Sequence, residues 1–276
     1  MTTGWVEAAD RVLVWRQPVL DVNAVLVLGG AGALVVDTLS TPAQAHELAD
    51  AVRRVTPLPW RIVNTHHHFD HCYGNAVLAP DAGTEVWAHS ECVARYERWT
   101  ADDGGRARVE AVAAEYASSL PELAAAVSGV TLRGPDRAVS GEATLDLGDR
   151  PVELRHLGRA HTDNDLVVVV PDASVVLAGD LVENGAPPSF DDSWPLEWAG
   201  TVAALIELNP AAVVPGHGGV MSPAEVAAQH ADLTALEWAC RDGWRDHAPV
   251  AEVAAKAPFG SPLAVERAYA FLDGRL

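Results

Sequence analysis

The sequence Thr65-His66-His67-His68-Phe69-Asp70-His71 places four imidazoles and one carboxylate within seven residues. It directly follows Trp60-Arg61-Ile62-Val63-Asn64, an apolar run that is typical of a buried strand. A strand end holds side chains in fixed positions, whereas a free tail does not. If four of these side chains face one cleft, two can share one metal ion and two a second: His66, His68, Asp70 and His71.

The composition indicates a globular protein with a sizeable core. The chain has 276 residues, of which 49% are hydrophobic. Its apolar runs are strand-sized, far below the roughly 20 residues that cross a bilayer, so we expect no membrane span. A net charge of −19 without a Lys/Arg cluster argues against nucleic acid and against anionic membrane surfaces. Three scattered cysteines and an N-terminus without a secretory pattern favour the cytoplasm.

The order of predicted elements indicates two sheets packed face to face with helices outside. We expect strands at 11–15, 23–28, 33–36, 60–64, 85–88, 143–147, 152–157, 166–170, 175–178 and 211–214. We expect helices at 42–55, 90–99, 107–127, 196–208 and from 222 towards 242, with Gly104-Gly105 between the second and third and one or two short helices after the last. A single domain over 1–276 follows, with its core at about 12–221 and C-terminal helices at about 222–276.

Three further polar residues follow predicted strands and lie in turns that contain glycine: His161, Asp180 and His217. Together with the histidine cluster, that is His66, His68, Asp70 and His71, this makes seven candidate ligands, namely five imidazoles and two carboxylates. Such donors suit zinc, and also iron, manganese or nickel. Seven ligands exceed the need of one tetrahedral ion but suit two ions about 3.5 to 4 Å apart. Asp37, after the strand at 33–36, is either a supporting acid or a simple turn residue.

The order His66-x-His68-x-Asp70-His71, then His161, Asp180 and His217, resembles the metallo-β-lactamase superfamily from about Val12 to Met221. The resemblance implies an α/β fold, a four-layer αββα sandwich with the metals at one edge of the two sheets. It also implies that His66, His68 and His161 bind the first metal ion, that Asp70, His71 and His217 bind the second, and that Asp180 bridges them. Asp37 matches the acid that orients a ligating imidazole. The family often has Gly where this chain has Leu39 or Ser40, so the turn there is expected to differ.

The remaining histidines are expected not to bind metal. His67 lies between two ligands, and alternation along an extended segment directs its side chain to the other side, where packing or a surface position is expected. The others lack partners at metal spacing: His46, His89, His156, His230 and His247.

Hydrolysis is the expected reaction, because two divalent ions lower the pKa of a bridging water from about 16 towards 7 and polarise an acyl oxygen. We expect a dinuclear zinc hydrolase whose metal-bridging hydroxide attacks a small ester, thioester, lactone or β-lactam-like amide, with Asp70 orienting the hydroxide or moving its proton. The alternatives are a mononuclear iron dioxygenase acting on persulfides and a non-enzymatic binding protein on the same fold.

The substrate is expected to be a small molecule, and the long loop after Asp180 is a candidate for the wall of its pocket. That loop contains Phe190 and Trp194, which could form an apolar wall or simply pack as part of a surface loop. The stretch 161–165 resembles true β-lactamases of the superfamily, but these usually have Cys where Asp180 stands. A dedicated antibiotic-resistance enzyme is therefore not expected.

Overall fold

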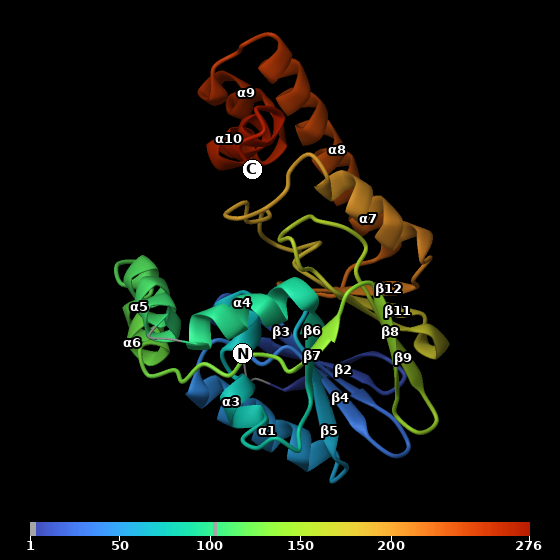
Figure 1. The fold of residues 1–276 in the computed structure, drawn as a ribbon. Coiled ribbons are helices and arrows are strands. Elements are labelled where there is room, and N and C mark those ends of the chain that lie inside the picture. Colours follow the sequence, from blue (N-terminus) through green and yellow to red (C-terminus); the bar gives the residue numbers. More distant parts are fainter. Residues whose placement is uncertain (1–3, 102–103) are drawn as a thin grey trace.

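Two β-sheets form the centre of the computed structural model, which describes residues 4–101 and 104–276 (Figure 1). The first sheet has seven strands in chain order: β1 (Trp5–Ala9), β2 (Val12–Gln17), β3 (Val22–Leu28), β4 (Ala33–Val36), β5 (Trp60–Val63), β6 (Val86–His89) and β7 (Arg137–Val139). The second has five, in the order β12 (Ala212–Pro215), β11 (Val175–Gly179), β10 (Val167–Val170), β9 (Pro151–Arg155) and β8 (Glu142–Asp146).

Both sheets combine antiparallel and parallel pairing. Strands β1 to β4 form an antiparallel meander, and β4 to β7 run parallel. In the second sheet only β11 and β12 are parallel. The parallel strands β4 and β5, and likewise β11 and β12, therefore bring their carboxyl ends to one edge of each sheet, where loops can present side chains to a common site.

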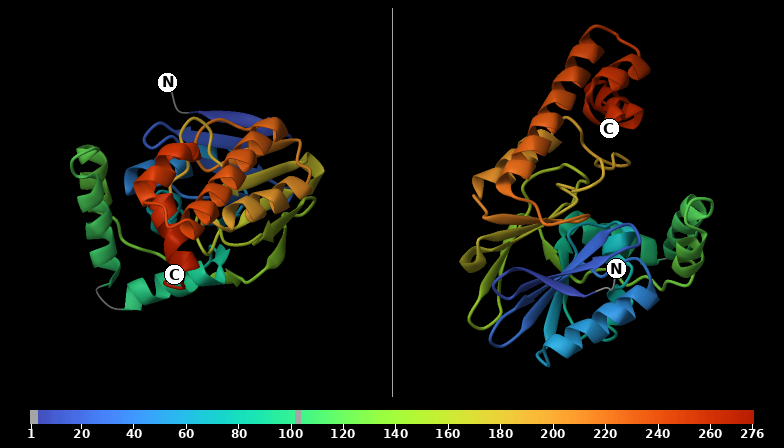
Figure 2. Two further views of the ribbon diagram at one scale, coloured as in Figure 1. Left: turned by 90° about the horizontal axis from the view of Figure 1, so that it is seen from above. Right: turned by 180° about the vertical axis from the view of Figure 1, so that it is seen from behind.

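Valine and leucine side chains from both sheets meet between them, among them Val14, Val27, Val63, Leu154 and Val168. Helix α1 (Pro42–Val55) covers the outer face of the first sheet, where Leu48 and Val52 pack on its apolar residues. Helices α7 (Trp198–Glu207) and α8 (Pro223–Arg245) cover the outer face of the second sheet (Figure 2). The expected αββα sandwich is thus confirmed, because each sheet buries one face against the other sheet and one face against helices.

The remaining helices are α2 (Phe69–Cys72), α3 (Asn75–Leu78), α4 (Ser90–Ala101), α5 (Gly104–Tyr116), α6 (Pro121–Val127), α9 (Val250–Lys256) and α10 (Pro262–Leu272), with short 3₁₀ turns at Pro171–Ala173 and Pro258–Gly260. They pack in part on other helices, α9 and α10 on α8 and α3 on α1 (Figure 1). Helices α5 and α6 pack through Val109, Val112 and Leu123 against Phe69 and Tyr73 next to the histidine cluster.

Side-chain caps begin three helices of the described part of the chain, namely α1, α8 and α10. Thr41 caps α1, since its side chain accepts a hydrogen bond from the backbone N–H of Gln44. At α8, Ser222 and Glu225 form a capping box. The single helix expected at 107–127 is wrong: it is two helices, because Pro121 starts a new one. Gly104 and Gly105 lie in the first turn of α5 instead of separating two helices.

Two strands were not predicted from the sequence. Strand β1 lies at the sheet edge with Val6 and Glu7 exposed, and β7 has only three residues. Neither shows the alternation of buried and exposed side chains that identifies a longer strand. Within the described residues, no helix is both long enough and apolar enough to cross a membrane.

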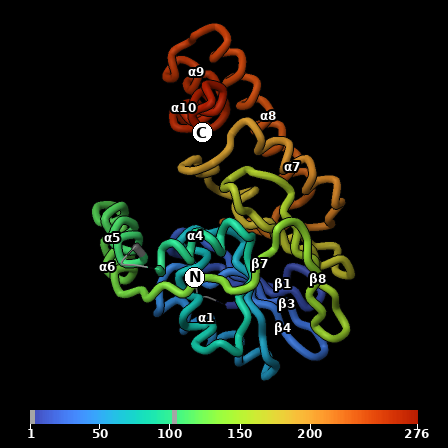
Figure 3. Tube along the Cα trace, in the orientation of Figure 1, coloured from blue at the N-terminus to red at the C-terminus, as the bar shows by residue number. Residues whose placement is uncertain are grey.

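The segment between β11 and α7, drawn in gold in Figure 3, runs between the sheets and the C-terminal helices. It contacts those helices directly: Arg267 of α10 donates to the Ser193 carbonyl over 2.6 Å, and the Trp194 ring lies 6.0 Å from that of Phe271. The loop is therefore held from its outer side by α10, while its start is fixed by the end of β11.

Candidate metal centre

The backbone of the histidine cluster changes to a helical conformation after His68. Strand β5 ends at Val63, residues 65–67 form bends, and His68, whose own backbone is extended, is the N-cap of the one-turn helix α2. The carbonyl of His71 accepts hydrogen bonds from the Thr38 backbone N–H at 2.9 Å and from the Asn64 amide at 3.0 Å. This fixed change from strand to helix directs His66 and His68 to one place and Asp70 and His71 to another.

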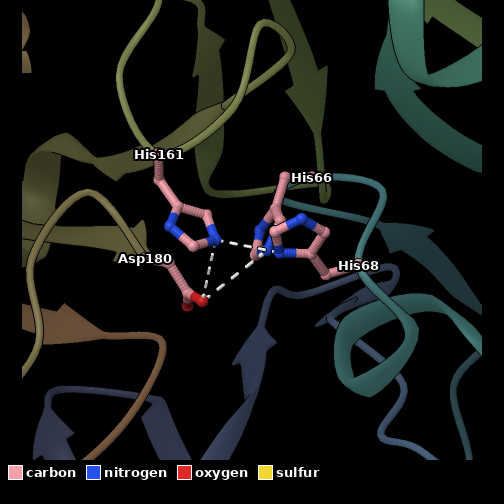
Figure 4. Close-up of side chains that lie close together, drawn as sticks. All are labelled: His66, His68, His161 and Asp180. Atoms are coloured by element: carbon pink, nitrogen blue, oxygen red, sulfur yellow. Dashed lines mark hydrogen bonds and ion pairs between the residues drawn. The ribbon is translucent and has the colours of Figure 1, made fainter. Parts of the chain in front are cut away.

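A first group of donors contains His66, His68, His161 and Asp180, whose ligand atoms all lie within 4.8 Å of one another (Figure 4). Nε2 of His161 lies 2.9 Å from Nδ1 of His68 and 3.4 Å from Oδ2 of Asp180. Nε2 of His66 lies 3.7 Å from the same oxygen. The loops after β9 and β11 therefore bring His161 and Asp180 to the two histidines at the end of β5.

A second group contains Asp70, His71 and His217. Nε2 of His217 lies 3.4 Å from Nε2 of His71 and 3.4 Å from Oδ2 of Asp70. Asp180 reaches this group as well, because its Oδ1 lies 3.3 Å from Nε2 of His71 and its Oδ2 lies 3.4 Å from Nε2 of His217. The Asp180 carboxylate thus lies between the two groups and contacts both.

Hydrogen bonds fix which ring nitrogen of His66, His71 and His217 faces the site. Asp37 accepts from Nδ1 of His71 at 2.8 Å, which leaves Nε2 of His71 towards the second group. Its carboxylate also accepts from the Thr65 backbone N–H and hydroxyl, each at 2.8 Å. The Thr65 hydroxyl oxygen lies 3.0 Å from Nδ1 of His66, and the Leu20 carbonyl lies 2.8 Å from Nδ1 of His217. Asp37 is therefore a supporting acid and not merely a turn residue.

The turn at Asp37 uses left-handed backbone conformations. Asp37 has φ +63° and Leu39 has φ +70°, the region that glycine adopts most easily. Leu39 thus retains a conformation suited to glycine although it carries a fully buried side chain. Packing of Leu39 in the core beneath α1 compensates for the backbone strain, which typically costs about 1 to 3 kcal/mol.

Burial and the Asp180 carboxylate shift the pKa values of the donors in different directions. Burial lowers the pKa of His66 well below its ordinary value and lowers the pKa of His161 to about 4, so both are neutral at neutral pH. Burial alone would raise the pKa of Asp180, but the facing imidazoles of His71 and His217 hold it well below the usual range. For His217, burial is outweighed by Asp180, which raises the pKa to about 10. His66 and His161 thus have the neutral form that binds metal, whereas His217 carries a proton that a bound metal ion would displace.

Metal ions fit the residues present. Buried side-chain atoms without a hydrogen-bond partner include Nε2 of His66 and Oδ1 of Asp180, although an orphaned buried polar atom costs about 1 to 3 kcal/mol. Both atoms point at the other donors of their groups. Imidazole and carboxylate are ligands of zinc, iron and manganese, and no thiolate is required.

A cavity of about 480 Å³ opens onto both groups. Its apolar wall is formed by residues that the sequence did not suggest, namely Leu20, Phe69, Trp99 and Tyr116, and two arginines, Arg95 and Arg108, also line it. These side chains come from α2, α4, α5 and the loop before β3. Nothing in their spacing along the chain reveals a shared cavity, because only the packing of α5 and α6 on Phe69 brings them there.

Phe190 and Trp194, the sequence candidates for the pocket wall, do not line this cavity. Phe190 is buried in the core beside Trp198, with ring centroids 5.4 Å apart. Trp194 lies under the guanidinium of Arg159, whose Cζ is 3.8 Å from the ring centroid. The prediction that Phe190 and Trp194 form the pocket wall is therefore wrong. Each anchors the loop to neighbouring elements, and the acidic residues of the loop, Asp191 and Asp192, line the cavity instead.

His67 belongs to neither group, but contrary to the alternation expected of an extended segment it lines the same cavity and forms a third cluster of donors with His68 and Asp192, whose ligand atoms all lie within 4.8 Å of one another. Its Nδ1 lies 2.9 Å from the Asn164 amide nitrogen, and its Nε2 lies 3.2 Å from Oδ2 of Asp192. Among the described residues, the other five histidines belong to no group of metal donors: His46, His89, His156, His230 and His247.

The chain matches the family model described as the metallo-beta-lactamase superfamily over residues 18–217. It belongs to that superfamily. Membership, together with a complete set of metal-binding groups, makes it a metallo-hydrolase.

Solved structures of similar fold include the metallo-beta-lactamase from Pontibacter korlensis, which is 17% identical with a TM-score of 0.65, the match covering 84% of this chain and 99% of that one. The DIM-1 metallo-beta-lactamase is 15% identical with a TM-score of 0.64, covering 84% of this chain and 96% of that one. FIM-1 from Pseudomonas aeruginosa, in a mono-zinc form, is 16% identical with a TM-score of 0.63, covering 84% and 95%. At these identities the likeness shows a shared fold.

Proposed function

We propose that the protein is a dinuclear zinc hydrolase that cleaves a small acyl substrate, either an ester, a thioester, a lactone or a β-lactam-like amide. One observation carries the proposal: two groups of buried donors share the carboxylate of Asp180, which contacts His161 of the first group and His71 and His217 of the second. A carboxylate between two sets of imidazoles is the arrangement that a metal pair requires.

Zinc is the ion that fits best. His66, His68 and His161 would hold one ion, Asp70, His71 and His217 the other, and Asp180 both. A protein of similar fold, FIM-1, is described in a mono-zinc form, which supports zinc as the metal. Bound there, two ions would supply an acidified water and a Lewis acid for the acyl oxygen.

The residues of the chain contribute orientation, proton transfer and exclusion of water. Asp70 lines the cavity, and its Oδ2 lies 3.4 Å from Nε2 of His217, so it is placed to hold or move a proton at the reacting centre. Phe69, Trp99 and Tyr116 offer an apolar surface for the acyl part of the substrate. The cavity is of a size for a small molecule, which is the partner we propose.

The second donor group argues for hydrolysis over the iron dioxygenase alternative. A mononuclear enzyme needs only the first group, yet Asp70, His71 and His217 lie within ligand distance of one another and two of them are held by Asp37 and by the Leu20 carbonyl. For the compartment we propose the cytoplasm, supported by the three buried free cysteines, Cys72, Cys92 and Cys240.

Metal analysis and a substrate screen test the proposal together. Protein purified without chelator is expected to carry about two equivalents of zinc and to hydrolyse at least one of a set of acyl, lactone and β-lactam chromogens. Asp180→Ala should lose most of the rate and part of the zinc while keeping its circular dichroism spectrum. Protein that holds no metal contradicts the proposal, and iron with sulfur-dependent oxygen uptake favours the dioxygenase.

A further inference from the structure

His68 is the one ligand of the first group whose ring is held by the long loop after β11. Nδ1 of His68 lies 2.9 Å from Nε2 of His161 and so faces the other donors. Nε2, on the far side of the ring, lies 2.9 Å from Oδ1 of Asp192. A carboxylate accepts only, so this contact places the ring proton on Nε2 and leaves the lone pair of Nδ1 directed at the metal position.

Asp192 is itself held by residues from two other segments, the histidine cluster and α4. Its Oδ2 lies 3.2 Å from Nε2 of His67 and 3.5 Å from Nη1 of Arg95 on α4. The Asn164 amide nitrogen lies 2.9 Å from Nδ1 of His67, and Nη1 of Arg95 lies 3.1 Å from Nε2 of the same ring, so these contacts hold the ring beside Asp192. Nη2 of Arg95 in turn donates to both carboxylate oxygens of Asp163, at 2.9 and 3.0 Å.

The loop is anchored on both sides of Asp192. Phe190, two residues before it, is buried against Trp198, and Trp194, two residues after it, lies under Arg159. Ser193 is tied through its carbonyl to Arg267. The position of Asp192 is therefore fixed by core packing and by its own hydrogen bonds, which is what orienting a ligand requires.

We propose that Asp192 is the positioning residue of the first metal group, with His67 and Arg95 holding it in place. The inference rests on the proposed metal-binding function. It assigns a role to the loop that differs from forming an apolar pocket wall: the loop sets the tautomer and orientation of His68. Asp192 would thus orient His68 as Asp37 orients His71. In each of the two groups, one ligating imidazole would be oriented by a carboxylate that does not itself bind the metal.

The same atoms permit one rival interpretation, since His67, His68 and Asp192 could themselves hold a third ion. Arg95 argues against it, because its Nη1 lies 3.1 Å from Nε2 of His67 and its permanent charge occupies the place where a cation would sit. Zinc stoichiometry distinguishes the two interpretations.

The experiment compares Asp192→Ala and Asp192→Asn with the neighbouring Asp191→Asn, which removes a cavity carboxylate bonded only to Ser189 among the hydrogen bonds found. Stepwise zinc affinities are measured by competition with a chromogenic chelator, and histidine tautomers by ¹⁵N–¹H correlation of the imidazoles, with and without zinc. We expect Asp192→Ala to weaken one zinc site by roughly 10- to 100-fold, to leave the other unchanged, and to remove the Nε2–H form of His68. Asp192→Asn keeps an acceptor oxygen and should recover part of both.

Wild-type zinc affinities with an unchanged His68 tautomer in Asp192→Ala would overturn the inference, and so would a third zinc equivalent that this variant loses. If the wild type takes up no zinc, the proposed function fails. The tautomer of His68 in the metal-free wild type and variant still decides whether Asp192 positions it, so the two failures can be told apart.

Discussion

The Asp37 carboxylate lies 2.8 Å from Nδ1 of His71 and also accepts the backbone N–H and the hydroxyl of Thr65, the residue before His66. One buried acid at the end of β4 thereby fixes the start of the histidine cluster and one of its ligands. The arrangement links the fold to the site, because β4 and β5 are adjacent parallel strands in register.

Asp37→Asn is expected to lower the affinity of one zinc site by roughly 10- to 100-fold, because an amide at this position can donate to Nδ1 of His71 and so shift its proton to the ligating nitrogen. Zinc competition titrations measure the change. Asp136→Asn, which removes a carboxylate bonded to Arg133 away from the site, serves as control. Equal zinc affinity in Asp37→Asn and the control would show that Asp37 acts on folding alone.

Gly216→Ala is expected to disrupt the metal site without altering a ligand. A Cβ at Gly216 would lie 1.7 Å from Oδ1 of Asp180, so the carboxylate between the two groups must move. Zinc content and hydrolysis should both fall, as measured by metal analysis and by the rate on the best chromogen. Gly219→Ala is the matched control in the same loop, because the nearest atom to its Cβ is 3.6 Å away. Similar zinc content in both variants would contradict the prediction.

Asp70→Asn is expected to reduce the hydrolytic rate by about 100-fold or more, since the carboxylate is placed to handle a proton at the reacting centre and also belongs to the second donor group. Kinetics and zinc analysis of the same sample separate the two effects. Loss of rate with both zinc equivalents retained points to proton transfer, whereas loss of one equivalent points to ligation. Glu110→Gln, on the exposed side of α5, is the control. If Asp70→Asn keeps the wild-type rate and the wild-type zinc content, Asp70 has no role in catalysis or in metal binding.

Acid is expected to destabilise the fold through His89. Its side chain is buried beside His156, with ring centroids 4.2 Å apart, and burial lowers its pKa from 6.5 to about 4. Between these values the unfolded chain binds a proton that the folded chain does not, so stability is complete above pH 6.5 and is lost as the pH falls towards 4. The loss at pH 5 should be about 1 to 2 kcal/mol from this residue.

Urea unfolding of the wild type and of His89→Gln at pH 7.5 and pH 5 measures this contribution. The variant should lose less stability between the two pH values than the wild type does. His46→Gln, which changes an exposed histidine on α1, should behave as the wild type. An equal acid effect in all three proteins would assign it to other groups.

The sequence by itself determined the class of fold and the seven candidate metal donors, because both follow from short patterns of neighbouring residues. Helix caps such as Thr41-Pro42 and Ser222-Pro223, and valine-rich strands that end in glycine turns, depend on neighbouring residues only. The donors were recognisable because each follows a strand. Pro121 is an equally local signal, because proline begins a new helix where the helical pattern of 107–127 would otherwise continue.

Only the tertiary structure decided what surrounds the metal donors. The partner of His68 is Asp192, 124 positions along the chain, and its bond depends on how the loop packs between α7 and α10. Phe190 and Trp194 lie in the same loop, yet core packing turns both away from the cavity, and α4 and α5 supply the wall instead. Ligand identity follows from a few adjacent residues, whereas ligand orientation and pocket shape follow from contacts between distant segments, which no local pattern records.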